Sequence, residues 1–78
     1  MKYPLLKVSW IDSWGVVGWN GIEELQELSA AKCVTVGWRV RQNKESMTLL
    51  QTISEETDSG NGTITIPKGC ITEVKKIE

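Results

Sequence analysis

The sequence predicts one small, mainly β domain built from five short strands, spanning residues 1–78. Three observations predict it. Apolar and polar residues alternate along several short segments, residues that favour turns separate these segments, and 78 residues make one domain. A domain of this size buries only about 60% of the surface of its unfolded chain. It therefore commonly needs a disulfide, a metal ion or self-association as further support.

The first strand is predicted around residues 6–10, where Leu6, Val8 and Trp10 alternate with Lys7 and Ser9 and form one buried face. The segment 12–18 that follows is expected to form an irregular loop. Asn20 and Glu23 then have the spacing of a capping box, with Asn20 as the N-cap. This pattern predicts a helix of about two turns that ends near residues 29–30.

The second strand is predicted at 34–41, where one face would carry four apolar residues: Val34, Val36, Trp38 and Val40. We expect this face to point into the core, with Trp10 of the first strand also buried. A polar turn at 42–45 leads to a third strand over 47–54. The polar segment 55–62, which contains two glycines, is expected to be a loop.

The C-terminal segment predicts two further strands with a break between them. A short fourth strand is predicted at 63–66, a break at Pro67-Lys68-Gly69, and a last strand over 70–77. The complete order is typical of a small SH3-like or Sm-like five-stranded barrel. It has a short helix in the first long loop and a 3₁₀ turn before the last strand.

The tryptophans are concentrated in the first predicted loop. Trp10, Trp14 and Trp19 fall within ten residues, in a chain that contains no Phe and a single Tyr. Trp14 and Trp19 fit neither a strand nor a helix period. They either pack on the helix as a second small core, or line a pocket, or form an oligomer interface. Because neither a disulfide nor a metal site is expected, self-association into a homo-oligomer is the predicted support.

Catalysis is poorly supported by the residue types present. The chain has no His, which is the usual general base, and Cys33 and Cys70 lack the partners of a catalytic thiol or a zinc site. The carboxylates Asp12, Glu23 and Glu24 are interpreted as a loop turn and a solvated helix face. The acidic segment 55–58 is interpreted as a solvated loop. We therefore expect a protein that is not an enzyme, with no cofactor and no metal.

The polar residues of the strands allow two interpretations. Arg39 and Arg41 form either an exposed strand face that keeps the protein soluble or part of a ligand site, and Lys68 is either an ordinary surface lysine or part of that site. Arg39 and Arg41 are predicted on the strand face opposite the core, where they can hold a phosphate group bidentately, and Lys68 is a further phosphate contact. A base can stack on Trp14 or Trp19. The glycines around the helix start allow a close backbone approach, although Glu23 and Glu24 already occupy that positive helix end. The candidate ligand-binding residues are Trp14, Trp19, Arg39, Arg41, Asp12 and Lys68.

The charge balance narrows the class of partner. With a formal net charge of −1 and a pI near 5.4, a nucleic-acid polymer is disfavoured and an RNA-binding Sm-like ring is the least favoured interpretation. No apolar run approaches the roughly 20 residues of a membrane span, so no membrane partner is expected. The first residues, Met1-Lys2-Tyr3-Pro4, lack the apolar core of a signal peptide, and a cytoplasmic location is expected.

Four segments together resemble a group of small phage and prophage proteins: Val8-Ser9-Trp10-Ile11-Asp12, Gly18-Trp19, Val36-Gly37-Trp38 and Ile66-Pro67-Lys68-Gly69-Cys70-Ile71. The resemblance implies a phage gene product that acts in the cytoplasm of a bacterial host. Small phage proteins of this kind often counter host defence, and one class sequesters the nucleotide signals of bacterial immunity. The hypothesis is a binding protein that sequesters a small nucleotide-type signal. The alternative is a protein-binding inhibitor or adaptor that acts on a host protein through its Trp-rich loop.

Overall fold

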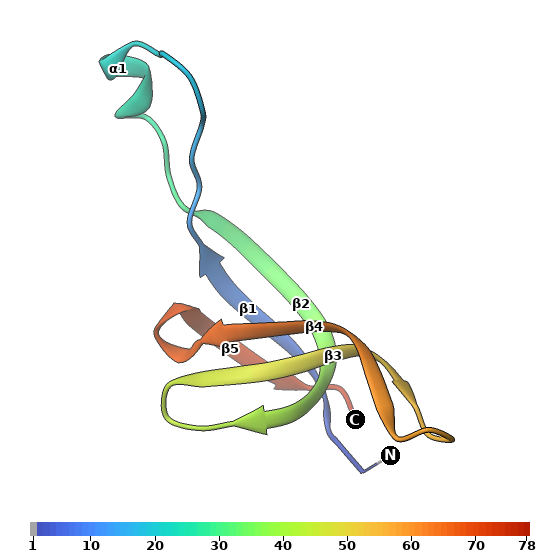
Figure 1. Cartoon of the computed structure of the whole chain (residues 1–78). Coiled ribbons are helices and arrows are strands. Elements are labelled where there is room, and N and C mark those ends of the chain that lie inside the picture. The colour runs from blue at the N-terminus through green and yellow to red at the C-terminus, as the bar shows by residue number, and fades with distance from the viewer. Residues whose placement is uncertain (1) are drawn as a thin grey trace.

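In the computed structural model, which describes residues 2–78, five antiparallel strands form one sheet (Figure 1). The elements in chain order are β1 (Leu5–Asp12), α1 (Ile22–Leu25), β2 (Ala31–Gln42), β3 (Ser46–Ser54), β4 (Ser59–Pro67), the 3₁₀ turn η1 (Lys68–Cys70) and β5 (Ile71–Lys76). The five strands, the helix in the first loop and the 3₁₀ turn before the last strand confirm the predicted elements.

The sheet has the strand order β4-β3-β2-β1-β5 and is not closed. Among residues 2–78, β4 and β5 are its two edge strands, and no ladder joins them. The predicted mainly β class is therefore confirmed, while the observed sheet stops short of a closed barrel. No helix in residues 2–78 is long and apolar enough to span a membrane.

Two irregularities in register bend the sheet. The β2–β3 register shifts between Arg39 and Arg41, so Val40 is an extra residue in β2. The β1–β5 register shifts at Ser9 and Trp10, and there the Thr72 hydroxyl donates to the Ser9 carbonyl oxygen at 3.1 Å. Such bulges increase the local twist of a sheet. Here they accompany the folding of the β3–β4 hairpin across β1 and β5 (Figure 1).

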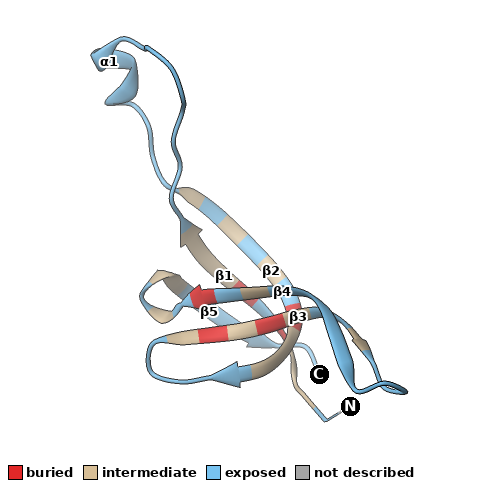
Figure 2. Cartoon of the chain, viewed as in Figure 1, coloured by how far each residue is buried: buried red, intermediate tan, exposed pale blue. Residues whose placement is uncertain are grey.

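The core lies between β1 on one side and β3 and β4 on the other. Its buried side chains are Leu6, Val8, Met47, Leu49 and Ile66. The strands and the 3₁₀ turn, residues 5–12 and 31–76, are called the body here. Figure 2 shows that the buried residues all lie in the strands of the body and none in the segment that carries α1. Trp10 is half-buried and packs against this cluster, as predicted for an inward-facing residue of the first strand.

The predicted core face of β2 is wrong. Val34 and Val36 are 61% and 51% exposed, and Trp38 is only half-buried, whereas Gly37 is buried. The register explains the difference, because residues directly opposite in an antiparallel pair share a face of the sheet. The buried residues Leu6 and Val8 lie opposite Gly37 and Thr35, so these two residues face the core and the valines face outward.

The first loop and the third loop also differ from their predictions. Helix α1 has a single turn, Gly21 is its N-cap, and the side chain of Asn20 donates to the Gly18 carbonyl oxygen instead of capping the helix. Short helices depend on packing for stability, and every residue of α1 is exposed. The loop predicted over 55–62 is shorter, because β4 already begins at Ser59.

Candidate functional site

The segment between β1 and β2, residues 13–30, extends away from the strands and is called the arm here (Figure 1). Every residue of the arm is exposed. Trp14 is 62% exposed and Trp19 is fully exposed, so these side chains do not form a second small core within one chain. Of the three uses predicted for them, a pocket or an interface with another molecule remains.

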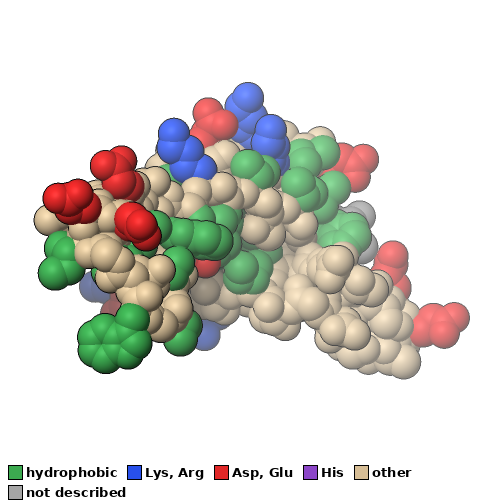
Figure 3. All heavy atoms as spheres, turned by 90° about the horizontal axis from the view of Figure 1, so that it is seen from above, with side chains coloured by type: hydrophobic (Ala, Val, Ile, Leu, Met, Phe, Trp, Pro, Cys, Tyr) green, Lys and Arg blue, Asp and Glu red, His purple; other side chains and the backbone are tan. Residues whose placement is uncertain are grey.

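The arm is apolar for an exposed segment. Its exposed hydrophobic residues are Trp14, Val16, Val17, Trp19, Ile22, Leu25 and Leu28. Its charged residues are all acidic: Glu23, Glu24 and Glu27. Figure 3 shows acidic and hydrophobic side chains side by side at the end of the molecule that carries the arm. An exposed apolar patch rimmed by polar groups marks an interaction surface.

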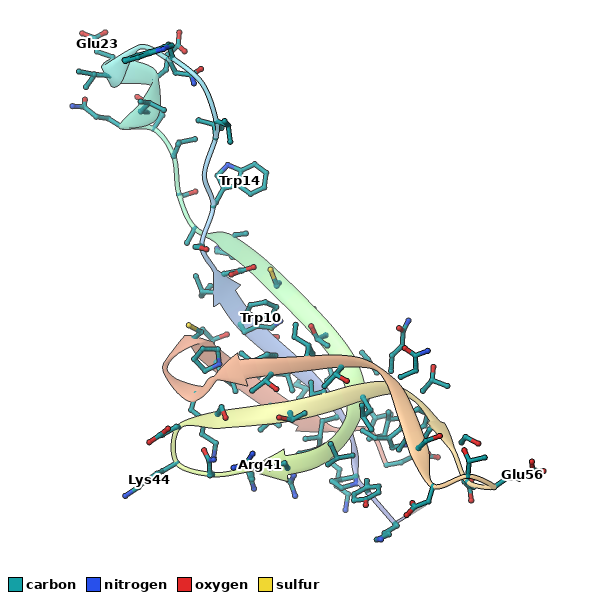
Figure 4. All side chains as sticks on the ribbon, in the orientation of Figure 1. Trp10, Trp14, Glu23, Arg41, Lys44 and Glu56 are labelled. Carbon is teal, nitrogen blue, oxygen red and sulfur yellow. The ribbon has the colours of Figure 1, made fainter. Side chains whose placement is uncertain are left out.

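The structure separates Arg41 from the tryptophans of the arm. Figure 4 shows Trp14 beyond one end of β2 and Arg41 at the other end. About 30 Å of strand separates Ala31, at the base of the arm, from Arg41. One chain therefore does not bring Trp14 or Trp19 together with either arginine.

The two arginines also point to different faces. Arg39 lies opposite the buried Leu49, which places it on the core side of the sheet, and it is half-buried. After the extra residue Val40, Arg41 lies opposite Thr48 and is exposed. The prediction that both arginines lie on the face opposite the core is therefore wrong for Arg39, because Arg39 continues the face of Thr35 and Gly37, which is the core face of β2. The extra residue Val40 then places Arg41 on the outer face.

Arg39 and Lys68 line a common hollow of about 300 Å³. Its other lining residues are Gln42, Met47, Ile71 and Val74. The Lys68 Nζ donates a hydrogen bond to the Gln42 Oε1 at 3.2 Å, which holds the ammonium group at the rim. No acidic residue in the described part of the chain lines this hollow. It therefore combines two cations with an apolar wall.

Arg39 also lines a larger hollow of about 650 Å³ on its other side. This hollow contains two aromatic residues that the sequence prediction did not assign to a site, Tyr3 and Trp38. The remaining lining residues are Lys2, Pro4, Leu5, Lys76 and Glu78. The Arg39 backbone N–H donates to the Pro4 carbonyl oxygen at 2.9 Å, which ties β2 to the segment before β1. Arg39 thus lies between a hollow with aromatic walls and a hollow with a second cation.

Asp12, the last predicted site residue, lies at the base of the arm. Its carboxylate accepts a hydrogen bond from the Ser13 backbone N–H at 2.8 Å, and the residue is exposed. Of the six predicted residues, the structure brings together Arg39 and Lys68 only. No group of three or more His, Cys, Asp or Glu side chains within residues 2–78 is arranged to hold a metal ion.

Comparison with protein-family models, curated proteins and solved structures finds no significant match to this chain.

Proposed function

We propose that this chain is a non-enzymatic binding protein that sequesters a small nucleotide-type ligand in the two hollows beside Arg39. The observation that carries the proposal is the position of Arg39. It is half-buried between an aromatic hollow and a hollow that also contains Lys68 but no carboxylate.

The side chains around Arg39 suit the two parts of a nucleotide. An arginine can hold a phosphate group through two parallel N–H donors, and Lys68 supplies a second positive charge. Tyr3 or Trp38 offers an aromatic face for a base, and such stacking contributes about 1–3 kcal/mol per base. This site keeps Arg39 and Lys68 from the sequence prediction and replaces Trp14 and Trp19 with Tyr3 and Trp38.

The wider biological role follows from the resemblance of the sequence to small phage proteins. We extend the proposal to a phage-encoded protein of SH3-like architecture that acts in the host bacterial cytoplasm. There it would withdraw a nucleotide signal from a host defence pathway. The strand order and the 3₁₀ turn before β5 support the architecture, and the cation-lined hollow supports the class of ligand.

Thermal denaturation tests the proposal directly. The protein is melted with a panel of cyclic dinucleotides, cyclic trinucleotides and cyclic ADP-ribose isomers. A ligand at one hundred times its dissociation constant stabilises the folded state by about 2.7 kcal/mol, which raises the melting temperature of a domain this small by about 10 °C or more. Arg39→Ala should abolish that shift. Arg41→Ala is the matched control, because Arg41 lies outside both hollows.

Two outcomes would contradict this site. A panel that produces no shift argues against a nucleotide-type ligand, and an equal loss in both arginine variants argues against the hollows.

The exposure of Trp14 and Trp19 supports a second candidate function, in which the arm inhibits a host protein. In that case Trp19→Ala should release a co-purifying host protein, while Arg39→Ala should leave it bound.

A further inference from the structure

The surface of one chain is too large for a compact monomer. A folded monomer of 8.7 kDa exposes about 4,700 Å², whereas this chain exposes 6153 Å². Its radius of gyration is 16.0 Å, compared with about 11.5 Å for a compact domain of this length. The difference in area, about 1,400 Å², exceeds the roughly 800 Å² that each partner buries in a standard interface. The excess is thus large enough for a stable dimer contact.

The outer face of β1 and β2 provides a surface that is complementary to the arm. Val34 and Val36 are exposed there, and the register places Lys7 directly opposite Val36. Lys7 also lies directly opposite Lys75 of β5, and both lysines are exposed. Like charges that face each other across two strands destabilise a sheet. Lys32 and Glu73 are exposed on the same face, so its three lysines outnumber its single carboxylate. This face therefore combines an apolar strip with a net positive charge that an acidic partner would stabilise.

The arm is acidic and apolar, and is therefore complementary to this face. It contains three of the ten acidic residues of the chain and none of the nine basic ones, so its formal charge is −3 and that of the remaining chain is +2. Its apolar side chains are exposed beside these glutamates. Both halves of a complementary contact are thus present on one chain, which is the condition for a self-complementary, two-fold interface.

The backbone of β2 is also free to pair. Its ladder with β1 runs from Ala31 to Trp38, but its ladder with β3 begins only at Trp38. Within residues 2–78, the segment Ala31–Gly37 therefore has a partner strand on one side only. An open strand edge is a template for pairing with another chain. Two such edges, paired antiparallel, would bring the arm of each copy beside the body of the other.

We infer that the occupant of this surface is a second copy of the chain. The two copies pair through the free edges of β2, and the arm of each lies on the outer face of the other. Trp14 and Trp19 pack against Val34 and Val36 of the opposite copy, and the arm glutamates approach its Lys7 and Lys75. No residue of the arm lines the hollows beside Arg39, and neither do Val34 and Val36.

Sedimentation of the full chain tests the inference. At micromolar concentration we expect a dimer with twice the 8.7 kDa mass of the chain. Trp19→Ala should raise the dissociation constant of the dimer at least about tenfold, because a buried tryptophan is a common interface hot spot. The melting temperature of the monomer should not change, because Trp19 touches no core residue.

Reversing the charges of the arm and of the outer face in separate variants tests whether the partner is a second copy of the chain. The double variant Glu23→Lys/Glu24→Lys and the double variant Lys7→Glu/Lys75→Glu should each sediment as a monomer. An equimolar mixture should restore the dimer, since each arm then meets a face of opposite charge. Lys44→Glu, which makes one Lys→Glu change in the exposed β2–β3 turn, is the control and should stay dimeric.

Three results would overturn the inference. They are a monomeric parent protein, a closed assembly larger than a dimer, and a mixture of the two charge variants that remains monomeric. A monomeric parent that captures another protein through Trp19 would assign the arm to that protein instead.

Discussion

The body and the arm of this molecule are both rich in apolar residues, but only the body covers them. In the body, β3 and β4 fold across β1 and enclose Leu49 and Ile66 almost completely. In the arm, no element of residues 2–78 covers Trp19 or Val17, and both are fully exposed. Local sequence sets how apolar a segment is, whereas the strands that pack against it determine whether it forms a core.

This difference separates two uses of apolar residues. Burial of Leu49 or Ile66 stabilises the fold of one chain, because their surface leaves water when the chain folds. The surface of Trp19 leaves water only when another molecule binds. Substitutions in the body should therefore change the free energy of unfolding, and substitutions in the arm should change association.

The largest expected effect is that of a core truncation. Ile66→Ala removes most of a fully buried side chain and should lower the free energy of unfolding by about 2–5 kcal/mol. Ile22→Ala, the same change in the arm, should lower it by no more than about 0.5 kcal/mol. Urea denaturation at low protein concentration, where the chain is a monomer, measures both. Equal losses would show that the arm is packed against the body.

The next largest effect on stability is expected from a comparison of two glycine substitutions, one in β2 and one in the arm. A Cβ at Gly37 would lie 2.8 Å from the Leu50 carbonyl oxygen and 3.2 Å from the Leu49 Cβ, at the point where β3 separates from β2. Gly37→Ala should therefore cost about 1–3 kcal/mol of stability. Gly15→Ala in the arm has no atom within 4 Å of the new Cβ and should be close to neutral. Thermal melts of the two variants give the comparison, and a neutral Gly37→Ala would contradict the close β2–β3 approach.

A double-mutant cycle measures the polar contact at the boundary of the core. The Trp10 Nε1 donates to the Thr35 Oγ1 at 3.0 Å, and both residues are half-buried. Trp10→Phe and Thr35→Val should show a coupling energy of about 0.5–1.5 kcal/mol in urea denaturation. Additive losses in the two single variants would mean that this hydrogen bond contributes nothing to stability.

The smallest expected effect compares two asparagines. The Asn43 Oδ1 accepts hydrogen bonds from the backbone N–H groups of Glu45 and Ser46 at 2.8 and 2.9 Å in the β2–β3 turn. Asn43→Ala should cost about 1 kcal/mol. Asn20→Ala in the arm removes a single 3.3 Å bond to the Gly18 carbonyl oxygen and should stay within about 0.5 kcal/mol. Thermal melts that show a larger loss of stability for Asn20→Ala than for Asn43→Ala would contradict this expectation.

The body was largely predictable from the sequence, and the exceptions have a physical cause. In β1 the apolar alternation and the packing agree, so Leu6 and Val8 were assigned correctly to the core. In β2 the alternation was predicted correctly, but the face that carries Val34 and Val36 was assigned to the core and is the outer face. Periodicity separates two faces without saying which is buried, and the pairing of Leu6 with Gly37 decides that.

The candidate site was predictable only in part. Arg39 and Lys68 were identified by their residue types, and the structure brings them to one hollow. Tyr3 and Trp38 join Arg39 through pairing of β1 with β2, which places Leu5 opposite Trp38 across a long stretch of chain. No local pattern reports such a pairing, so the aromatic side of the hollow was missed.

The position of β1 between β2 and β5 has a consequence for how the chain folds. β1 is synthesised first among the strands, yet its partner on one side, β5, is synthesised last. The Leu5 N–H donates to the Glu78 carbonyl oxygen at 2.7 Å, which joins residues from the two ends of the chain. Pairings between residues so distant in sequence slow folding, because the chain loses entropy before these contacts form. During synthesis β1 therefore keeps an unsatisfied edge until the ribosome has released residues 71–76.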